Sequence, residues 1–186
     1  GQRVEDVATP RAFQRDPVLV WRFYNLRRAN LATVLPNPGH HALVELENRL
    51  NNTFTLVTQN VDGLHQAAGS RNVLEIHGAI RRVRCSGCGL VTDRGLETLP
   101  ELPRCDACTE LLRPDVVWFE EALPEEVWDR AVEAVQACDC FLVIGTSAVV
   151  YPAAGLIDVA RLEGADVIEI NLEPSAASAR ADVVLL

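Results

Sequence analysis

The chain has 186 residues, of which 48% are hydrophobic and 23% are charged, and its formal net charge is -9. This balance is typical of a globular protein, and the acidic excess argues against a partner with a phosphate backbone, so we expect no nucleic-acid partner. No apolar run approaches the roughly 18 residues of a membrane-spanning helix, and residues 1–10 lack the basic and apolar regions of a signal peptide. We therefore expect a cytoplasmic protein with no membrane partner. The oligomeric state stays open.

Two helices are predicted in the N-terminal part of the chain, because each starts with a capping side chain followed by proline. Asp16 is the expected N-cap of the first, and Pro17 occupies its first helical position. Asn37 and Pro38 repeat this signal for the second helix. The two helices are expected in residues 16–34 and 37–50.

Strands and helices then alternate along the chain. Apolar runs predict strands in residues 53–58, 72–78, 140–147, 166–171 and 182–186, and helices in residues 61–69, 124–137 and 152–164. The run CFLVIGTS, residues 140–147, is typical of a strand that is buried on both faces. This alternation predicts an α/β fold with a Rossmann-like, doubly wound parallel sheet.

Residues 80–115 interrupt this alternation with two C-x2-C pairs. The pairs are Cys85 with Cys88 and Cys105 with Cys108. This spacing predicts a zinc site rather than a disulfide framework, and it suits a reducing cytosol. Four thiolates leave no open coordination position, so we expect one structural Zn²⁺ in an inserted zinc-binding module of residues 80–115. Residues 1–79 and 116–186 would then form the Rossmann-like domain.

Polar and small residues follow four of the predicted strands at their carboxyl ends. They are Gln59, Asn60 and Asp62, then His77 and Gly78, then Gly145, Thr146 and Ser147, and finally Asn171. Because the carboxyl ends of parallel strands lie at one edge, we expect these residues to converge on a ligand crevice. At any single strand the alternative is a polar cap on a core strand. His77 is the general-base candidate of the set, since imidazole accepts a proton near neutral pH, although a lone histidine is more often structural.

Several segments, in order along the chain, resemble motifs of the sirtuins. They are TQNVDGLHQAAG, LEIHG, the two C-x2-C pairs, RPDVVWFEEALP, IGTSAVVYPAAGL and EINLEPS, and the resemblance runs from about residue 1 to residue 186. It implies an NAD-dependent protein-lysine deacylase with an NAD-binding Rossmann-like domain. In this family the acyl oxygen of a modified lysine attacks the ribose carbon that carries nicotinamide, nicotinamide leaves, and the acyl group ends on ADP-ribose.

The resemblance also implies a role for each motif. His77 corresponds to the catalytic base, which activates a ribose hydroxyl. The implied cofactor-binding residues are Gln59, Asn60 and Asp62 around nicotinamide and its ribose, Gly145, Thr146 and Ser147 at the adenosine-side ribose and phosphates, and Asn171 and Glu173 at the adenosine ribose. The segment Val117, Trp118, Phe119 and Glu120 corresponds to the one that pairs with the substrate peptide as an added strand.

Acyl choice is suggested by Tyr24 and Arg27, which lie three residues apart and therefore share a helix face. The stretch YNLR resembles the Tyr-x-x-Arg pair of the sirtuin subgroup (class III) that removes succinyl, malonyl and glutaryl groups. An acyl chain ending in a carboxylate needs a cation, and arginine offers a two-pronged donor. The alternative is a solvated arginine-rich face, because Arg22 and Arg28 are neighbours. We expect desuccinylase and demalonylase activity with weaker deacetylase activity.

The glycine-rich Gly-Ala-Gly-x-Ser stretch and the last helix of sirtuins have no counterpart in this sequence. We therefore expect a chain truncated at both ends, with an incomplete NAD-binding domain, and the alternative function is a catalytically weak NAD-binding relative of the same family. ADP-ribosyl transfer to protein is a side activity to consider. A zinc-ribbon nucleic-acid module would explain the cysteines alone. A Rossmann dehydrogenase would need G-x-G-x-x-G after a strand, which is not found.

Overall fold

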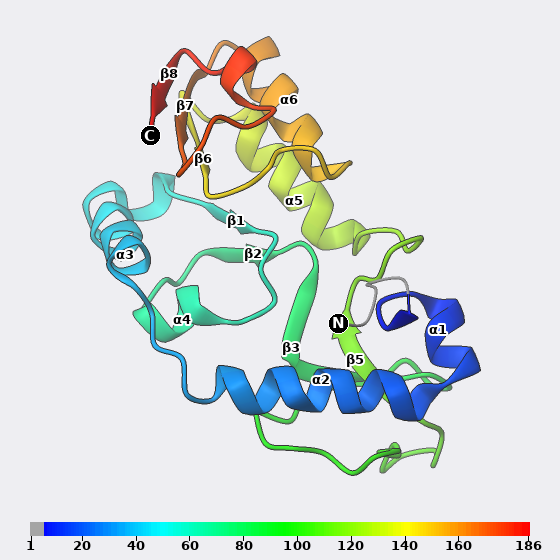
Figure 1. Ribbon diagram of the computed structural model, residues 1–186. Coiled ribbons are helices and arrows are strands. Elements are labelled where there is room, and N and C mark those ends of the chain that lie inside the picture. The colour runs from blue at the N-terminus through cyan, green and yellow to red at the C-terminus, as the bar shows by residue number, and fades with distance from the viewer. Residues whose placement is uncertain (1–5) are drawn as a thin grey trace. The chain divides into compact units, whose positions relative to one another are not determined.

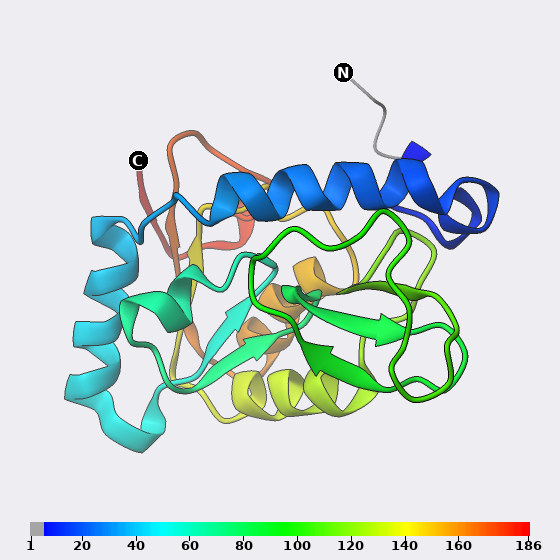
Figure 2. The same cartoon turned by 90° about the horizontal axis from the view of Figure 1, so that it is seen from below.

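The computed structural model describes residues 6–186, and the chain divides into two compact units. The first unit ends at Glu125 and the second spans Glu126–Leu186. Figure 1 and Figure 2 show the elements of each unit from two directions. The predicted division into a Rossmann-like domain and an inserted module of residues 80–115 stays a prediction.

Both helices predicted near the N-terminus form, and both start as expected. The Asp16 carboxylate accepts the Leu19 N–H at 2.9 Å, and the Asn37 side chain accepts the His40 N–H at 3.1 Å. A short preceding helix was not predicted, although Thr9 repeats the same signal ahead of a proline. The helices of this part are α1 (Pro10–Arg15), α2 (Pro17–Leu31) and α3 (Pro38–Leu50), followed by the 3-10 turn η2 (Asn51–Thr53). Figure 2 shows α1 and α3 at opposite ends of α2.

A parallel strand pair follows these helices in the first unit. β1 (Leu56–Thr58) pairs with β2 (Val73–Glu75), and helix α4 (Leu64–Ala68) connects them. Gly69 ends α4 in the left-handed conformation with φ 113°, as the sequence predicted. This β-α-β unit confirms the predicted parallel pairing and brings the segment after each strand to the same end of the pair.

The region with the C-x2-C pairs is built on a three-stranded antiparallel sheet in the order β4-β3-β5. These strands are β3 (Gly78–Cys85), β4 (Val91–Asp93) and β5 (Leu112–Val116). They were not predicted, because three of the eight residues of β3 are arginines, which obscure the alternation of apolar side chains. Arg82 and Arg84 instead donate to Asp115 on β5, each at 2.9 Å or less, so the strand carries its charges in pairs.

The core of the first unit forms where α2 packs on this antiparallel sheet (Figure 1). Trp21 on α2 is fully buried, and its indole N–H donates to the Leu112 carbonyl oxygen at 2.8 Å. Its apolar neighbours in the core include Val20, Ile80, Val83, Val116 and Trp118. Burying an indole on the sheet removes a large apolar surface from water while keeping its polar group paired.

Arg28 joins the end of α2 to the same sheet. The side chain is 1% exposed and donates to the carbonyl oxygens of Ile80, Glu97 and Arg94. The alternative of a solvated arginine-rich face is therefore wrong for Arg28. It holds for Arg22, whose side chain is 70% exposed and pairs with a surface glutamate.

The second unit is a parallel sheet in the order β6-β7-β8 with its helices, and Figure 1 shows it at the red and yellow end of the chain. Its elements are α5 (Glu125–Gln136), β6 (Cys140–Ile144), η3 (Ala153–Gly155), α6 (Leu156–Leu162), β7 (Asp166–Ile170), η4 (Ser178–Arg180) and β8 (Val183–Leu185). All the helices and strands predicted here form. Together with the pair β1–β2, this sheet confirms the α/β class with parallel strands.

One expectation about β6 is wrong. The strand was expected to be buried on both faces, but only Val143 is buried, and Ile144 is 42% exposed. Within the part of the chain that the structure describes, β6 is paired with β7 alone, so it is an edge strand. The apolar run of β6 therefore predicts a strand correctly, but it does not predict how far that strand is buried.

Among residues 6–186, no helix is long and apolar enough to cross a membrane.

Candidate functional site

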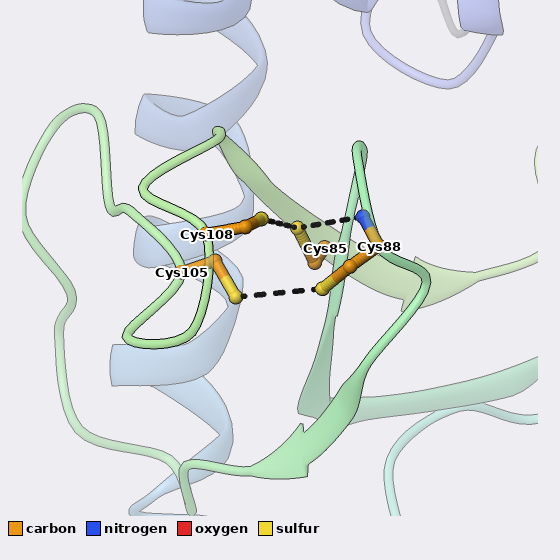
Figure 3. Close-up of side chains that lie close together, drawn as sticks. All are labelled: Cys85, Cys88, Cys105 and Cys108. Atoms are coloured by element: carbon orange, nitrogen blue, oxygen red, sulfur yellow. Dashed lines mark hydrogen bonds between the residues drawn. The ribbon is translucent and has the colours of Figure 1, made fainter.

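The four cysteines of the C-x2-C pairs come together in the first unit (Figure 3). All four sulfur atoms lie within 4.8 Å of one another. The closest approaches join Cys85 to Cys108 at 3.3 Å and Cys88 to Cys105 at 3.8 Å, so each contact crosses from one pair to the other. Sulfur donors at this spacing are the ligand set of a closed, tetrahedral zinc site, and all four are free thiols.

Backbone N–H groups favour the thiolate form of one cysteine in this cluster. The N–H groups of Cys88 and Gly87 point at the Cys85 sulfur from 3.4 and 3.3 Å, and they hold the pKa of that thiol at about 6. Thiolates are the metal-binding form, so the donor set fits one structural zinc ion. Four thiolate ligands leave no coordination position for water or substrate, so the zinc site is structural and not catalytic.

His77 follows β2, and its ring is fixed by the segment that follows β1. Nδ1 lies 3.0 Å from the Gln59 carbonyl oxygen. A carbonyl oxygen can only accept a hydrogen bond, so Nδ1 carries the proton and Nε2 is the basic nitrogen. The carbonyl oxygen of His77 in turn accepts the Val117 N–H at 2.9 Å.

The residue after His77 lets β3 pass close to β5. Gly78 has φ 78°, and a Cβ at this position would lie 2.2 Å from the Asp115 carbonyl oxygen. Only glycine fits both the left-handed backbone and this approach. His77 therefore occupies a corner whose shape depends on its glycine neighbour.

The other predicted residues after β1 shape the turn into α4. Asn60 is exposed, and its N–H donates to the Thr58 hydroxyl at 3.1 Å. The half-buried Asp62 carboxylate accepts the Leu64 N–H at 2.9 Å, which fixes the carboxylate at the start of α4. Gln59, Asn60, Asp62 and His77 are thus brought to one end of the β1–β2 pair.

The predicted peptide segment Val117–Glu120 leaves β5 beside His77. Trp118 is 3% exposed and stacks under the Arg113 guanidinium, whose carbon lies 3.6 Å from the ring centre. Phe119 and Glu120 are exposed. Two cavities of about 360 and 340 Å³ touch the segment, the first at Val117 and the second at Phe119 and Glu120.

Tyr24 and Arg27 lie on α2, on the side that meets this segment. The Tyr24 hydroxyl oxygen accepts the Trp118 indole N–H at 2.9 Å, and burial raises the pKa of the phenol. Arg27 is exposed, with its guanidinium carbon 5.5 Å from the centre of the Phe23 ring. Tyr24 is therefore a neutral hydroxyl anchored by Trp118, and Arg27 is a solvent-facing cation nearby.

The remaining predicted residues belong to the second unit. Gly145 follows β6 with φ 61°, and its N–H donates to Ile170 at 3.0 Å. The Asn171 amide donates to the Thr146 carbonyl oxygen at 2.9 Å, so the segments after β6 and β7 are joined. The exposed residues of this set are Gly145, Ser147 and Glu173. Because these residues and those around His77 belong to different units, the predicted convergence of all four strand ends stays a prediction.

Two supporting residues near these sites were missed from the sequence. Glu121 pairs with both guanidinium nitrogens of Arg113 at 2.6 and 2.7 Å and accepts the Trp118 N–H at 2.8 Å. Glu169 on β7 is completely buried. The sequence around Glu121 and Glu169 does not distinguish an inward-pointing carboxylate from a solvent-facing one, so only the fold shows their positions.

The family model described as the Sir2 family matches residues 2–152 of the chain. The "NAD-dependent protein deacylase 2" of Pyrobaculum aerophilum is 52% identical over 183 residues, which is 97% of this chain and 72% of that protein. The "NAD-dependent protein deacylase" of Pyrococcus furiosus is 49% identical over 189 residues, covering 98% of this chain and 75% of that protein.

Solved structures agree with these sequence matches. A Sir2 homologue in complex with NAD superposes with a TM-score of 0.93 at 46% identity, covering 98% of this chain and 72% of that one. Sir2Tm bound to a propionylated peptide gives a TM-score of 0.88 at 30% identity, covering 97% and 78%. On the fold, the cysteine cluster and these matches, the chain belongs to the Sir2 family, the sirtuins, whose members are NAD-dependent protein deacylases.

Proposed function

We propose that this chain removes acyl groups from lysine side chains of proteins or peptides in the cytoplasm, with succinyl and malonyl preferred over acetyl. NAD is consumed, and the products are nicotinamide, O-acyl-ADP-ribose and the free lysine. The observation that carries the proposal is the fixed tautomer of His77, whose Nδ1 is held 3.0 Å from Gln59. Relatives are named deacylases, and a similar structure holds a propionylated peptide, which supports the substrate class.

His77 is the proposed base of the reaction. With Nδ1 protonated, Nε2 is able to take the proton of a ribose hydroxyl. The Gln59 contact fixes the ring orientation as well, so the base does not have to be reorganised when the substrate arrives. The six free cysteines suit a reducing compartment, which supports the cytoplasmic location.

Gln59, Asn60 and Asp62 are the proposed nicotinamide and ribose residues. Positive charge develops on the ribose as the bond to nicotinamide breaks. Asp62 is held by the Leu64 N–H and is placed at the same end of the strand pair as His77, so its carboxylate is able to offset that charge.

The adenosine half of NAD is assigned to the second unit. Gly145, Thr146 and Ser147 are the proposed contacts to its ribose and phosphates, and Asn171 and Glu173 the contacts to the ribose. Gly145 has no side chain and a positive φ, which permits close backbone approach. NAD would supply the electrophilic ribose carbon.

The segment Val117–Glu120 is the proposed strand-pairing site for the peptide. Val117 and Trp118 follow β5 directly, and Phe119 and Glu120 form an exposed turn, while Trp118 anchors the segment in the core. A hydrogen bond of 2.9 Å joins Val117 to His77, which supports a peptide lysine presented near the base.

The acyl preference rests on Tyr24 and Arg27. Because the Tyr24 oxygen accepts from Trp118, its own hydroxyl proton is available to a carboxylate. Arg27 is exposed and forms no ion pair with a carboxylate among residues 6–186, so its guanidinium is suited to the charged end of a succinyl or malonyl group.

The test is mass spectrometry of succinyl-lysine and acetyl-lysine peptides incubated with the chain, with and without NAD. Loss of succinyl together with nicotinamide release is expected only with NAD. The variant Arg27→Met should lower kcat/KM for desuccinylation by about 100-fold and change deacetylation by less than about threefold, since only the charged acyl end uses the cation.

Arg22→Met is the matched control, because Arg22 is on the same helix but pairs with Glu101 at the surface. It should leave both activities unchanged. Equal losses of desuccinylation and deacetylation in Arg27→Met would remove the acyl preference from the proposal. Nicotinamide release without loss of the acyl group would favour the weakly catalytic NAD-binding alternative.

A further inference from the structure

Glu169 is a buried carboxylate in the second unit that the proposed chemistry does not use. It lies on β7 with no exposed surface. One carboxylate oxygen accepts the Ser175 hydroxyl and the other accepts the Ser178 hydroxyl, the second at 2.5 Å. No arginine or histidine pairs with it among residues 6–186. A buried charge is costly unless its lone pairs are satisfied, so these hydroxyls are essential partners.

The two serine hydroxyl groups also form hydrogen bonds with the backbone of the loop after β7. The Ser178 hydroxyl oxygen also accepts the Ser175 N–H at 2.9 Å, and the Ser175 hydroxyl oxygen accepts the Ala177 N–H at 3.0 Å. Each hydroxyl thus donates to Glu169 and accepts from the loop. Residues 175–178 are folded around the carboxylate.

The same loop is attached to the segment after β6. The Ala176 N–H donates to the Ser147 carbonyl oxygen at 3.3 Å, and the Asn171 amide donates to that of Thr146 at 2.9 Å. The Asn171 amide nitrogen also lies 3.4 Å from Glu169. The carboxylate is therefore connected to both segments that follow the strands β6 and β7.

We propose that Glu169 is a positioning residue for the adenosine half of NAD, which holds Gly145–Ser147 and Asn171–Glu173 in their binding conformation before the nucleotide arrives. This inference rests on the proposed function, because that is where the two segments are assigned to the nucleotide. Preorganised segments lose less conformational freedom on binding, so the expected benefit is in affinity for the nucleotide. The hydroxyls of Ser175 and then Ser178 lower the pKa of Glu169, in agreement with an acceptor that is ionised at neutral pH.

Two Ser178 variants separate the hydroxyl from the bulk of the side chain. Ser178→Ala removes the donor to Glu169, whereas Ser178→Thr keeps it. Glu169→Gln replaces the charged acceptor with a neutral one. Glu47→Gln is the control for neutralising a buried carboxylate, because Glu47 is 2% exposed and accepts backbone N–H groups in the first unit.

The first measurement is amide hydrogen exchange without any nucleotide. The N–H groups of residues 175–177 and the segment 145–148 should exchange at least about tenfold faster in Ser178→Ala and Glu169→Gln than in Ser178→Thr and Glu47→Gln. Unchanged exchange in these segments would overturn the inference, whatever the outcome for the proposed function.

The second measurement is calorimetric binding of ADP-ribose, followed by KM for NAD, KM for the peptide and kcat. In Ser178→Ala the Kd of ADP-ribose and KM for NAD should rise about tenfold, with kcat and the peptide KM unchanged. A merely structural role predicts a lower melting temperature and a smaller active fraction with the same Kd, and that result overturns the inference. If the unaltered chain binds no ADP-ribose, the proposed function fails and the inference fails with it.

Discussion

The cysteine region of the first unit and the strand-end loops of the second unit reach a defined shape by different means. In the first, four cysteine sulfur atoms from two turns lie within 4.8 Å of one another, close enough for all four to bind a single metal ion. In the second, one buried carboxylate and two serine hydroxyls hold the loops without a metal ligand set. We therefore expect metal removal to affect the cysteine region, and the loss of hydroxyl or carboxylate groups to affect the loops of the second unit.

Removing zinc should have the largest effect, and it should act on the first unit alone. Chelation, or the variant Cys108→Ser, should unfold the cysteine region and abolish activity, because the free energy of zinc binding contributes directly to folding in structural sites. Metal analysis should find one zinc per chain before chelation, and hydrogen exchange should report loss of protection in residues 78–116. Protection in residues 140–186 should stay the same.

Cys140→Ser is the control for this experiment, because Cys140 is an exposed thiol on β6 outside the cluster. It should keep the zinc and the activity. Equal loss of protection in both units on chelation would show that the zinc site stabilises both of them.

A single methyl group at Gly78 should have the next largest effect, and it should act on the first unit alone. Gly78→Ala places a Cβ 2.2 Å from the Asp115 carbonyl oxygen at a φ of 78°, so β3 and β5 have to separate. The free energy of unfolding should fall by at least about 3 kcal/mol in urea titrations. Gly95→Ala has a similar φ of 58° with no atom near the new methyl, and it should cost only about 1 kcal/mol.

An ion-pair network also stabilises the first unit, and it does so without a metal ion. Arg82 donates to Glu75 at 2.7 Å and to Asp115 at 2.9 Å, and Glu75 also accepts from Gln66. Arg82→Met should cost about 2 kcal/mol of unfolding free energy, since two largely buried carboxylates lose a partner. The control Arg22→Met removes an exposed pair and should cost less than about 1 kcal/mol by the same urea titration. A smaller loss in Arg82→Met than in Arg22→Met would show that the network is not stabilising.

Lowering the pH should have the smallest effect on stability, and the two units should lose stability in different pH ranges. Burial, followed by the neighbouring His40, lowers the pKa of His65, so the first unit should start to lose stability as the pH falls below about 6.5, where the unfolded chain takes up the proton. The pKa of Glu169 is lowered by its serine partners, so its contribution is present above about pH 4.3 and is lost as the pH falls below that.

Hydrogen exchange against pH measures both windows. His65→Gln should flatten the response of the first unit below about pH 6.5, and Glu169→Gln should flatten that of the second unit below about pH 4.3. A single common transition, unaffected by either variant, would mean that neither group sets the acid response.

Local signals in the sequence were enough for much of the fold. The caps Asp16 and Asn37 predict the starts of α2 and α3, because the side chain and the helix lie within a few residues of each other. The four cysteines also predict their cluster, because two C-x2-C pairs at this separation are typical of one zinc site. Features that depend on distant partners were missed or wrong: β3 is masked by arginines whose carboxylates lie on another strand, and the exposure of β6 follows from having β7 as its one described neighbour.

The candidate site divides in the same way. Motif spacing identified His77 and the residues after β1, and the structure brings these together. It did not identify Glu169 or Glu121, because a carboxylate that points inward cannot be told from one that points to water by its neighbours in the chain. The convergence of the two groups of strand ends stays a prediction.

The bond between the His77 carbonyl oxygen and the Val117 N–H has a thermodynamic consequence for inhibition. This backbone contact joins the proposed base to the proposed peptide segment, so we expect a ligand that shifts the His77 backbone to shift the peptide-pairing segment as well. Binding free energies that are coupled in this way are reciprocal. If a compound at the nicotinamide side raises the affinity of the chain for peptide by some factor, peptide must raise the affinity for the compound by the same factor.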